Sequence, residues 1–271
     1  MNGVESFLTA DETALCESFL GRGYVIIEAE DRPALERISS LVATAAANHL
    51  KVTVPEDRQE FFNRIHETVA VETLNGLRLA IIGTIGTAEG FRSDYFALVR
   101  NTLATLVGNE LAMQRGIGLS VQLPGDDSSL LQIHADVWDG DSPFEVVVWL
   151  PLVDCYRSKS MYLLDLKHDR ALQAALPGMA LANAEAIFEA AKDKVTFPDV
   201  RYGQALIFSQ TLMHGNRINR EPESRWSLNC RFKSLLSPYA DKKIGEFFTP
   251  ITLRPATRLG IDYRMPEAFN E

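Results

Sequence analysis

Cysteine is scarce in this chain of 271 residues. Its three cysteines, Cys16, Cys155 and Cys230, are odd in number and far apart, which excludes a disulfide framework and a paired-cysteine zinc site. Cysteines of this kind are commonly apolar core residues of proteins in reducing compartments. We therefore expect buried thiols and a cytoplasmic location.

Long apolar runs and an excess of positive charge are missing as well. No stretch reaches the roughly 18 apolar residues that a membrane-spanning helix needs. The net charge of −9 argues against nucleic acid and anionic membranes as partners, because both require clustered lysine and arginine. The first residues, MNGVESFLTADET, lack the basic, apolar and small-residue order of a signal peptide. No feature of the sequence specifies an oligomeric state.

What is present is the composition of a globular protein, with 46% apolar and 23% charged residues. The length suits one large domain, so we predict a single domain over residues 1–271. Within it we expect a mostly helical supporting layer at 1–114, a β-rich core at 115–240 and a C-terminal extension at 241–271.

The first part of the chain carries helical patterns. Thr9 and Glu12 have the spacing of a capping box, which predicts a helix that begins after Thr9 and runs to about Phe19. Further along we expect a strand at 24–29, a helix at 32–50, and two or three helices within 57–110.

Strand-like segments separated by Gly, Asp, Ser and Pro begin after residue 115. The run FEVVVWLPL shows no alternation, which predicts a strand that is buried on both faces. Helices first and strands second favour a mainly β fold with α-helices, in which a helical layer covers an antiparallel barrel or jelly roll. The expected strands are 116–124, 130–138, 144–155, 160–166, 194–200, 204–210 and 225–236, with a helical insert at 169–192.

One expected strand contains a metal-ligand pattern. In LQIHADVWDG, residues 131–140, His134 and Asp136 lie two positions apart, and such residues face the same side of a strand. A non-haem iron site needs two imidazoles and one carboxylate on one face. The pair therefore supplies two of the three ligands.

The second imidazole must come from another part of the chain. His49 and His66 lie in helical segments and fit a helix surface, and His168 lies where a helix is expected to begin. His214 follows the strand pattern ALIFSQTLM and precedes the turn-like GNRIN. A histidine at a strand end inside a barrel can meet a ligand pair on another strand, so His214 is the candidate third ligand.

A polar face continues the pattern beyond His214. RWSLNCRF, which begins at Arg225, alternates strictly between polar and apolar residues. The polar face could point to water, as in an ordinary surface strand. If it lies inside the barrel, Arg225 needs an anion, because an unpaired buried guanidinium costs several kcal/mol. A small dicarboxylate would satisfy Arg225, and the hydroxyl of Ser227 could add a donor.

The combination of His-x-Asp, a distal histidine and Arg-x-Ser about ten residues later resembles the pattern of Fe(II)- and 2-oxoglutarate-dependent oxygenases. The chain is most similar to the phytanoyl-CoA-hydroxylase-like branch, and within it to oxygenases of bacterial aminoglycoside and surface-carbohydrate gene clusters, such as relatives of a streptomycin-biosynthesis protein. The resemblance implies a double-stranded β-helix, a cupin-like jelly roll, with an N-terminal helical layer.

The resemblance also implies residue roles. His134, Asp136 and His214 would hold Fe(II), and 2-oxoglutarate would chelate the metal while its far carboxylate pairs with Arg225 and Ser227. The family uses O2, converts 2-oxoglutarate to succinate and CO2, and oxidises a C–H bond of a small molecule. We expect hydroxylation of a sugar, sugar nucleotide or aminoglycoside-type metabolite, although ring closure, desaturation or epimerisation would use the same chemistry.

Several further residues are expected near the site. Gln132 shares the parity of the metal ligands and should face the interior, where it could contact 2-oxoglutarate, and Asn229 continues the polar face of Arg225. Trp138, Asn216 and Arg217 are candidate substrate contacts. Arg231 should meet solvent or substrate, and Asp139 and Asp141 should serve a polar turn.

Two other functions stay open at this point. One is a cupin-like metal enzyme that does not use 2-oxoglutarate, which would leave Arg225 without a role. The other is a non-catalytic, carbohydrate-binding jelly roll, which would not need an intact set of metal ligands.

Overall fold

The computed structural model describes residues 7–54, 56–179 and 183–266. Residues 1–6, 55, 180–182 and 267–271 lie outside this description, and with them parts of the predictions for the N-terminus, the helical insert and the C-terminal extension. Among the described residues, no helix is both long enough and apolar enough to cross a membrane.

Helices form most of the first hundred residues, as predicted. The capping box is confirmed, because the Thr9 hydroxyl accepts from the amide of Glu12 and the Glu12 carboxylate accepts from the amide of Thr9. The described helices are α1 (Ala10–Arg22), α2 (Arg32–Leu50), α3 (Arg58–Asn63), α4 (Val71–Thr87), α5 (Phe91–Ala97), α6 (Arg100–Leu106), α7 (Leu166–Ala175), α8 (Ala184–Ala191) and α9 (Pro255–Asp262).

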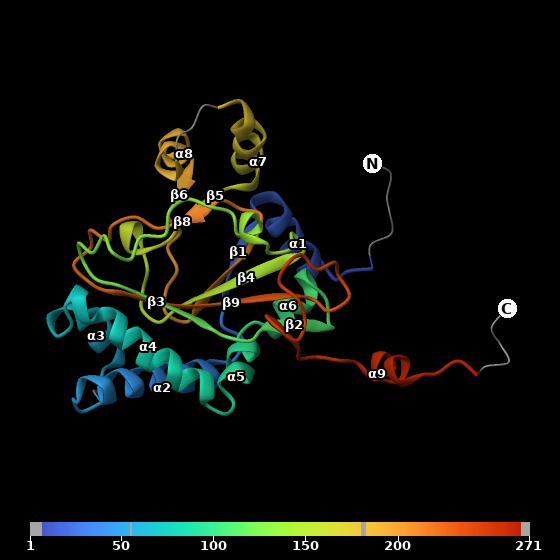
Figure 1. The fold of residues 1–271 in the computed structure, drawn as a ribbon, viewed down its shortest axis with the longest axis horizontal. Coiled ribbons are helices and arrows are strands. Elements are labelled where there is room, and N and C mark those ends of the chain that lie inside the picture. Colours follow the sequence, from blue (N-terminus) through green and yellow to red (C-terminus); the bar gives the residue numbers. More distant parts are fainter. Residues whose placement is uncertain (1–6, 55, 180–182, 267–271) are drawn as a thin grey trace.

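Two antiparallel sheets follow (Figure 1). A seven-stranded sheet has the order β1-β7-β4-β9-β2-β10, with β3 paired to β9, and a three-stranded sheet has the order β6-β5-β8. The strands are β1 (Tyr24–Glu28), β2 (Leu111–Gln114), β3 (Gly118–Gln122), β4 (Glu145–Pro151), β5 (Tyr162–Leu164), β6 (Val195–Thr196), β7 (Gln204–Ser209), β8 (His214–Gly215), β9 (Arg225–Ser234) and β10 (Phe248–Pro250).

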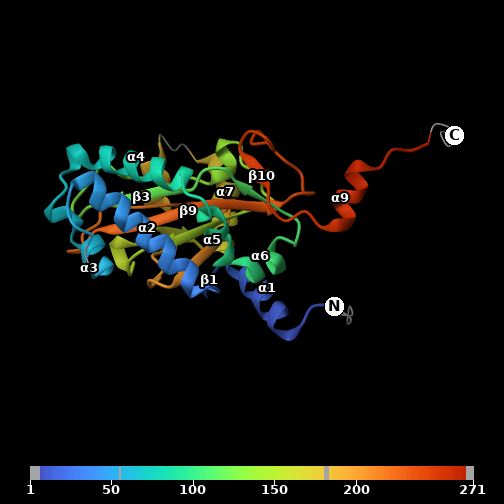
Figure 2. The same ribbon diagram turned by 90° about the horizontal axis from the view of Figure 1, so that it is seen from below.

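The large sheet is covered by helices on one side. Figures 1 and 2 show α2, α4 and α5 together on one side of the seven-stranded sheet, with the small sheet, α7 and α8 on the opposite side. The central strand β4 is buried along its whole length, which confirms the expectation for FEVVVWLPL. Of the cysteines, Cys155 and Cys230 are buried as predicted, whereas Cys16 on α1 is only partly covered.

The predicted strand at 130–138 is wrong. Only His134 of this segment pairs with another strand, through an isolated bridge to His214, and residues Asp136–Asp139 form a single 3₁₀ turn. Gly140, with φ of 84°, ends that turn in the left-handed region that glycine favours. The segment is therefore a loop that forms a single β-bridge to the small sheet, and it is this loop that carries the His-x-Asp pattern.

Candidate metal centre

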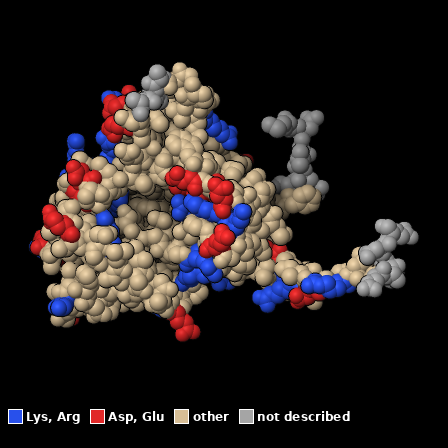
Figure 3. All heavy atoms as spheres, viewed as in Figure 1, with Lys and Arg blue, Asp and Glu red and all other residues tan. Residues whose placement is uncertain are grey.

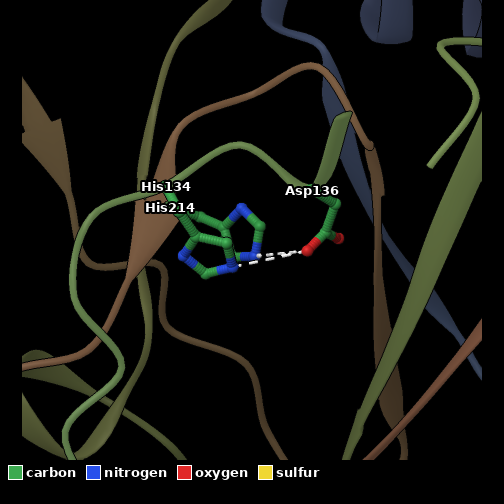
Figure 4. A group of neighbouring side chains, drawn as sticks. All are labelled: His134, Asp136 and His214. Atoms are coloured by element: carbon green, nitrogen blue, oxygen red, sulfur yellow. Dashed lines mark ion pairs between the residues drawn. The ribbon is translucent and has the colours of Figure 1, made fainter. Parts of the chain in front are cut away.

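The two predicted imidazoles and the carboxylate converge. The bridge holds the backbones of His134 and His214 together by two hydrogen bonds of 3.1 and 2.8 Å, and their ring centroids lie 4.3 Å apart. The 3₁₀ turn then brings Asp136 Oδ1 to 3.3 Å from Nε2 of His134 and 3.9 Å from Nε2 of His214 (Figure 4). All three candidate ligand atoms lie within 4.8 Å of one another.

Backbone carbonyls orient both rings. Nδ1 of His134 lies 2.8 Å from the carbonyl oxygen of Gln132, and Nδ1 of His214 lies 2.9 Å from that of Leu212. A carbonyl can only accept, so each Nδ1 carries a proton and donates it. The lone pair of each neutral ring is then on Nε2, the atom that faces Asp136, which is the arrangement that metal-binding histidines require.

The protonation states of His214 and Asp136 suit a divalent cation, whereas a cation would compete with a proton for His134. Burial lowers the pKa of His214 to about 4, so this ring is neutral at neutral pH. Burial opposes ionisation of Asp136, but its hydrogen bond to His134 and the positive charge of Arg231 outweigh burial, and the Asp136 pKa falls well below its ordinary value. For His134, burial is outweighed by the hydrogen bonds to Asp136 and Gln132, which raise its pKa.

These ligands face a cavity of about 550 Å³. The cavity wall is formed by seven separate segments of the chain, which supply the three candidate ligands together with charged, hydroxyl and apolar side chains. Figure 3 shows a hollow in this face of the molecule, with Lys and Arg side chains on its rim. The lining residues that sequence reasoning missed are Ser120, Ser128, Ser129, Leu130, Leu131, Val147, Trp149, Met161, Phe208 and Gly215.

Arg225 lies in the same cavity wall, as one of the two readings of β9 predicted. It is 3% exposed, and its Nη2 donates to Ser120 Oγ at 3.0 Å. Its Nε is buried without a hydrogen-bond partner, and no described carboxylate pairs with the guanidinium. The hydroxyl of Ser227, the other residue predicted to bind the anion, is also buried without a partner, but Ser227 does not line the cavity. Burial lowers the Arg225 pKa to about 10. A buried cation without an anionic partner indicates a site for an anion.

The apolar face of β9 packs against the helices, which explains why its polar face points inward. Trp226 Nε1 donates to the carbonyl of Phe62 in α3, and the rings of Phe232 and Phe96 in α5 lie 6.2 Å apart. The inward orientation of Arg225 is therefore fixed by the period-two pattern and the helical layer together.

Arg231 lies closer to the metal ligands than the sequence indicated. Its Nη2 is 3.1 Å from Asp136 Oδ1, and its Nε is 3.4 Å from Oδ1 of Asp141. Asp141 is buried and also pairs with Lys242, so the expectation that it serves only a polar turn is wrong. The alternation along β9 could have placed Arg231 in the cavity, since it lies on the same face as Arg225. No sequence pattern predicts its ion pair with Asp141, which lies ninety positions earlier in a loop.

The remaining candidates divide into cavity residues and residues with other partners. Asn229 and Asn216 line the cavity. The Asn216 side chain also holds the loop in place, because it accepts a hydrogen bond from Leu131 N and donates one to Ser129 O. Trp138 is 44% exposed and outside the lining. Arg217 forms a two-pronged ion pair with Glu185 of α8 and lies outside the lining.

The expectation that the Gln132 side chain faces the interior is wrong. It is exposed and does not line the cavity, because the segment is a loop in which strand parity does not hold. Gln132 contributes to the site through its main-chain carbonyl, which orients His134.

Gly215, next to the ligand His214, allows the loop and β8 to approach each other. A Cβ atom here would lie 2.5 Å from Tyr162 Oη and 2.6 Å from the carbonyl oxygen of Leu131. We expect Gly215→Ala to lower the free energy of unfolding by about 1–3 kcal/mol and to weaken Mn(II) binding by displacing His214. Thermal unfolding and calorimetric titration measure the two effects. Gly86→Ala on α4, where a Cβ would contact nothing, is the matched control and should lower neither the free energy of unfolding nor the Mn(II) affinity. Unchanged metal affinity in Gly215→Ala would contradict the prediction.

Glu145, at the start of β4, gives the protein a pH-dependent stability. It is 1% exposed and accepts hydrogen bonds from Ser142 N and Gln210 Nε2. Burial, assisted by the negative charge of Asp141, raises the Glu145 pKa from 4.5 to about 7. The native state therefore holds this proton more tightly than the unfolded chain, so stability declines as pH rises from about 4.5 to about 7.

Glu145→Gln should remove that decline, which we expect to amount to about 1–3 kcal/mol. The Gln210 amide can turn so that its oxygen, which has no partner in the wild type, accepts from the new amide. Denaturant unfolding at a series of pH values measures the slope. An identical slope in the variant would refute the assignment to Glu145.

The sequence matches no protein-family model and no curated protein. Its fold, however, is similar to those of solved non-haem oxygenases. The nickel complex of the non-haem monooxygenase ThoJ has a TM-score of 0.51 at 18% identity, covering 93% of this chain and 89% of ThoJ. HygX from Streptomyces hygroscopicus, solved with nickel and 2-oxoglutarate, has a TM-score of 0.50 at 12% identity, covering 86% and 89%.

SnoK, a non-haem α-ketoglutarate-dependent carbocyclase from nogalamycin biosynthesis, has a TM-score of 0.55 at 13% identity, covering 92% of this chain and all of SnoK. At these identities the similarity concerns the fold. The fold relationship that the sequence motifs predicted is thereby confirmed.

Proposed function

We propose that this protein is an Fe(II)- and 2-oxoglutarate-dependent oxygenase that oxidises a C–H bond of a small molecule. The observation that carries the proposal is one cavity wall with two parts: a cluster of two imidazoles and one carboxylate, and a buried guanidinium without an anion. The guanidinium is not needed for a stable core, since its Nε is buried without a partner.

The residues present fit both groups. Two imidazoles and a carboxylate on one face are the donor set of a non-haem Fe(II) site, which leaves positions open for other ligands. His134, Asp136 and His214 would hold the metal. When bound, Fe(II) would activate O2, which is the oxidant, and 2-oxoglutarate would supply two of the electrons that reduce it, a chemistry that the side chains lack.

The chain itself contributes binding, orientation and exclusion of water. Arg225 offers a planar fork to the far carboxylate of 2-oxoglutarate, with the free Ser227 hydroxyl as a further donor. His214 can bind the metal without losing a proton, since it is neutral already. Apolar lining residues such as Met161 and Phe208 would keep water away from the reacting carbon.

The finer parts of the proposal concern fold and substrate. We infer that the two sheets are a double-stranded β-helix with an N-terminal helical layer, forming one domain with the C-terminal extension. A sugar, sugar nucleotide or aminoglycoside-type metabolite suits a cavity that mixes serine hydroxyls and asparagine amides with apolar walls. SnoK and ThoJ are a carbocyclase and a monooxygenase, so ring closure stands beside hydroxylation as an outcome. The cytoplasmic location stays a prediction, and the free thiols are consistent with it.

Succinate formation tests the proposal. The protein is supplied with Fe(II), O2 and 2-oxoglutarate together with a panel of sugars, sugar nucleotides, aminoglycosides and amino acids, and succinate and oxidised product are quantified by mass spectrometry. We expect succinate that depends on both metal and protein, and that rises with one substrate class. Metal binding without any 2-oxoglutarate binding would favour the cupin-like alternative, and binding of neither would favour a non-catalytic module.

A further inference from the structure

The three candidate metal ligands are not oriented by the same kind of group. Each histidine is held by a main-chain carbonyl, that of Gln132 or Leu212, which accepts from its Nδ1. Asp136 has no such partner. Within the described part of the chain, its carboxylate pairs only with the two imidazoles and with Arg231. A metal ion would occupy the Nε2 lone pairs of both rings, so Arg231 is the one described group left to orient the carboxylate.

Arg231 projects from a rigid part of the fold. It lies in β9, opposite Val147 of the central strand β4. The side-chain oxygen of Gln114, at the end of β2, accepts from the main-chain amide of Arg231 at 3.2 Å and from its Nη1 at 3.4 Å. Asp136, in contrast, lies in the 3₁₀ turn of a loop. Because strands hold side chains more precisely than loops do, the guanidinium can define the position of the carboxylate.

A second carboxylate balances the charge of Arg231. Its Nε lies 3.4 Å from Oδ1 of Asp141, whose side chain is fully buried and whose other oxygen pairs with Lys242. The cluster thus contains two cations and two carboxylates, and it is neutral before a metal enters. A guanidinium with no such balance would repel a divalent cation at the centre. Asp141 therefore lets Arg231 contact Asp136 with less opposition to a metal ion.

We propose that Arg231 is a positioning residue of the metal centre, whose Nη2 holds Asp136 Oδ1 toward the two imidazoles while Asp141 balances its charge. The inference rests on the proposed metal-dependent function and adds a residue to it. Arg231 has no lone pair to offer a metal, so it acts only through Asp136. Loss of such an outer partner commonly lowers metal affinity by about 10- to 100-fold.

Calorimetric titration of Mn(II) into the full chain tests this role. Arg231→Met should lower the Mn(II) affinity by about 10- to 100-fold, because the carboxylate loses the group that orients it. Lys242→Met is the matched control, since it removes an equal charge from the same cluster without contacting Asp136, and its Mn(II) affinity should not fall. If Arg231 acted through its charge alone, its removal would raise the Mn(II) affinity.

Two further measurements separate positioning from a purely structural role. The visible absorption of Co(II)-loaded protein depends on ligand geometry, so at saturating Co(II) the bands should change in Arg231→Met and stay the same in Lys242→Met. Arg231→Lys covers the case in which Arg231→Met does not fold. Its ammonium keeps the charge but lacks the planar fork that reaches both carboxylates, so its Mn(II) affinity should fall below that of the wild type by less than the methionine variant's.

The outcomes distinguish this inference from the function on which it rests. A wild type that binds no Mn(II) would remove the metal centre and the role of Arg231 together. Wild-type or higher affinity in Arg231→Met, or in Arg231→Lys if the methionine variant is unfolded, would overturn the role of Arg231 and leave the centre in place. Unchanged Co(II) bands in a folded Arg231→Met protein would also overturn it, since the ligand geometry would then not depend on the guanidinium.

Discussion

Replacing His134 or His214 with alanine should abolish metal binding by this protein. The candidate centre has three ligand atoms within 4.8 Å of one another, and removal of one imidazole leaves an aspartate and a single histidine. Loss of an outer hydrogen-bonding partner alone commonly costs metal sites about 10- to 100-fold in affinity, so loss of a ligand should exceed ~100-fold. Calorimetric titration with Mn(II), which avoids oxidation of Fe(II), measures the affinity.

Two features of the molecule keep this experiment decisive. His134 is only partly buried, so His134→Ala should fold even if removal of the fully packed His214 disturbs β8. His168→Ala is the matched control, because this histidine is paired with Asp165 at the start of α7 and lies outside the cavity. Equal Mn(II) affinities for wild type, His134→Ala and His168→Ala would rule out the centre, whatever the activity assays report.

The convergence of these ligands was predictable from sequence, although not for the reason that strand parity suggested. His134 pairs with His214 through a single bridge, and the following 3₁₀ turn, not a strand, aims Asp136 at the two rings. His134 and Asp136 still face the same side because Ala135, the residue between them, is extended (φ −113°, ψ 133°). Gln132 shows the limit of the argument, since parity outside a strand gave its side chain the wrong direction.

Patterns that depend on local periodicity were more reliable than those that depend on loops. The alternation of β9 allowed two orientations of Arg225, and the structure has the inward one, because the apolar face of the strand covers the helical layer. The ion pairs of Arg231 with Asp136 and Asp141 could not be predicted, because they join a strand to a loop, and a loop has no periodic sequence pattern from which its conformation follows. The hydroxyl and apolar cavity walls come from scattered segments for the same reason.

Helix boundaries illustrate the same difference. Thr9 and Glu12 predicted the start of α1 correctly, because a cap is a contact between neighbours in sequence. Residues 57–110 hold four α-helices instead of the two or three expected. The last two, α5 and α6, are separated by only Leu98 and Val99, with no glycine or proline to mark the break.

Replacing Arg225 with methionine should weaken 2-oxoglutarate binding and stabilise the protein at the same time. Without a ligand, Arg225 is a buried cation that no described carboxylate pairs with, and exchanging a buried charged group for an apolar one of similar volume can stabilise a protein by about 1–4 kcal/mol. With a ligand, the same guanidinium would hold a carboxylate, and losing one partner of such a buried pair costs about 2–5 kcal/mol, roughly 30- to 4,000-fold in affinity.

The opposite signs of the two effects separate a binding role from a structural one. A guanidinium that served only the fold would destabilise the protein when removed, so a lower melting temperature for ligand-free Arg225→Met would contradict the anion site. Titration of 2-oxoglutarate into Mn(II)-loaded protein measures the affinity, and Mn(II) binding itself should be unchanged because Arg225 is not a ligand. Arg225→Lys should fall between wild type and Arg225→Met, since an ammonium keeps the charge but lacks the planar fork. Arg217→Met is the matched control: Arg217 is already paired with Glu185 outside the cavity, so its loss should leave 2-oxoglutarate affinity at the wild-type value.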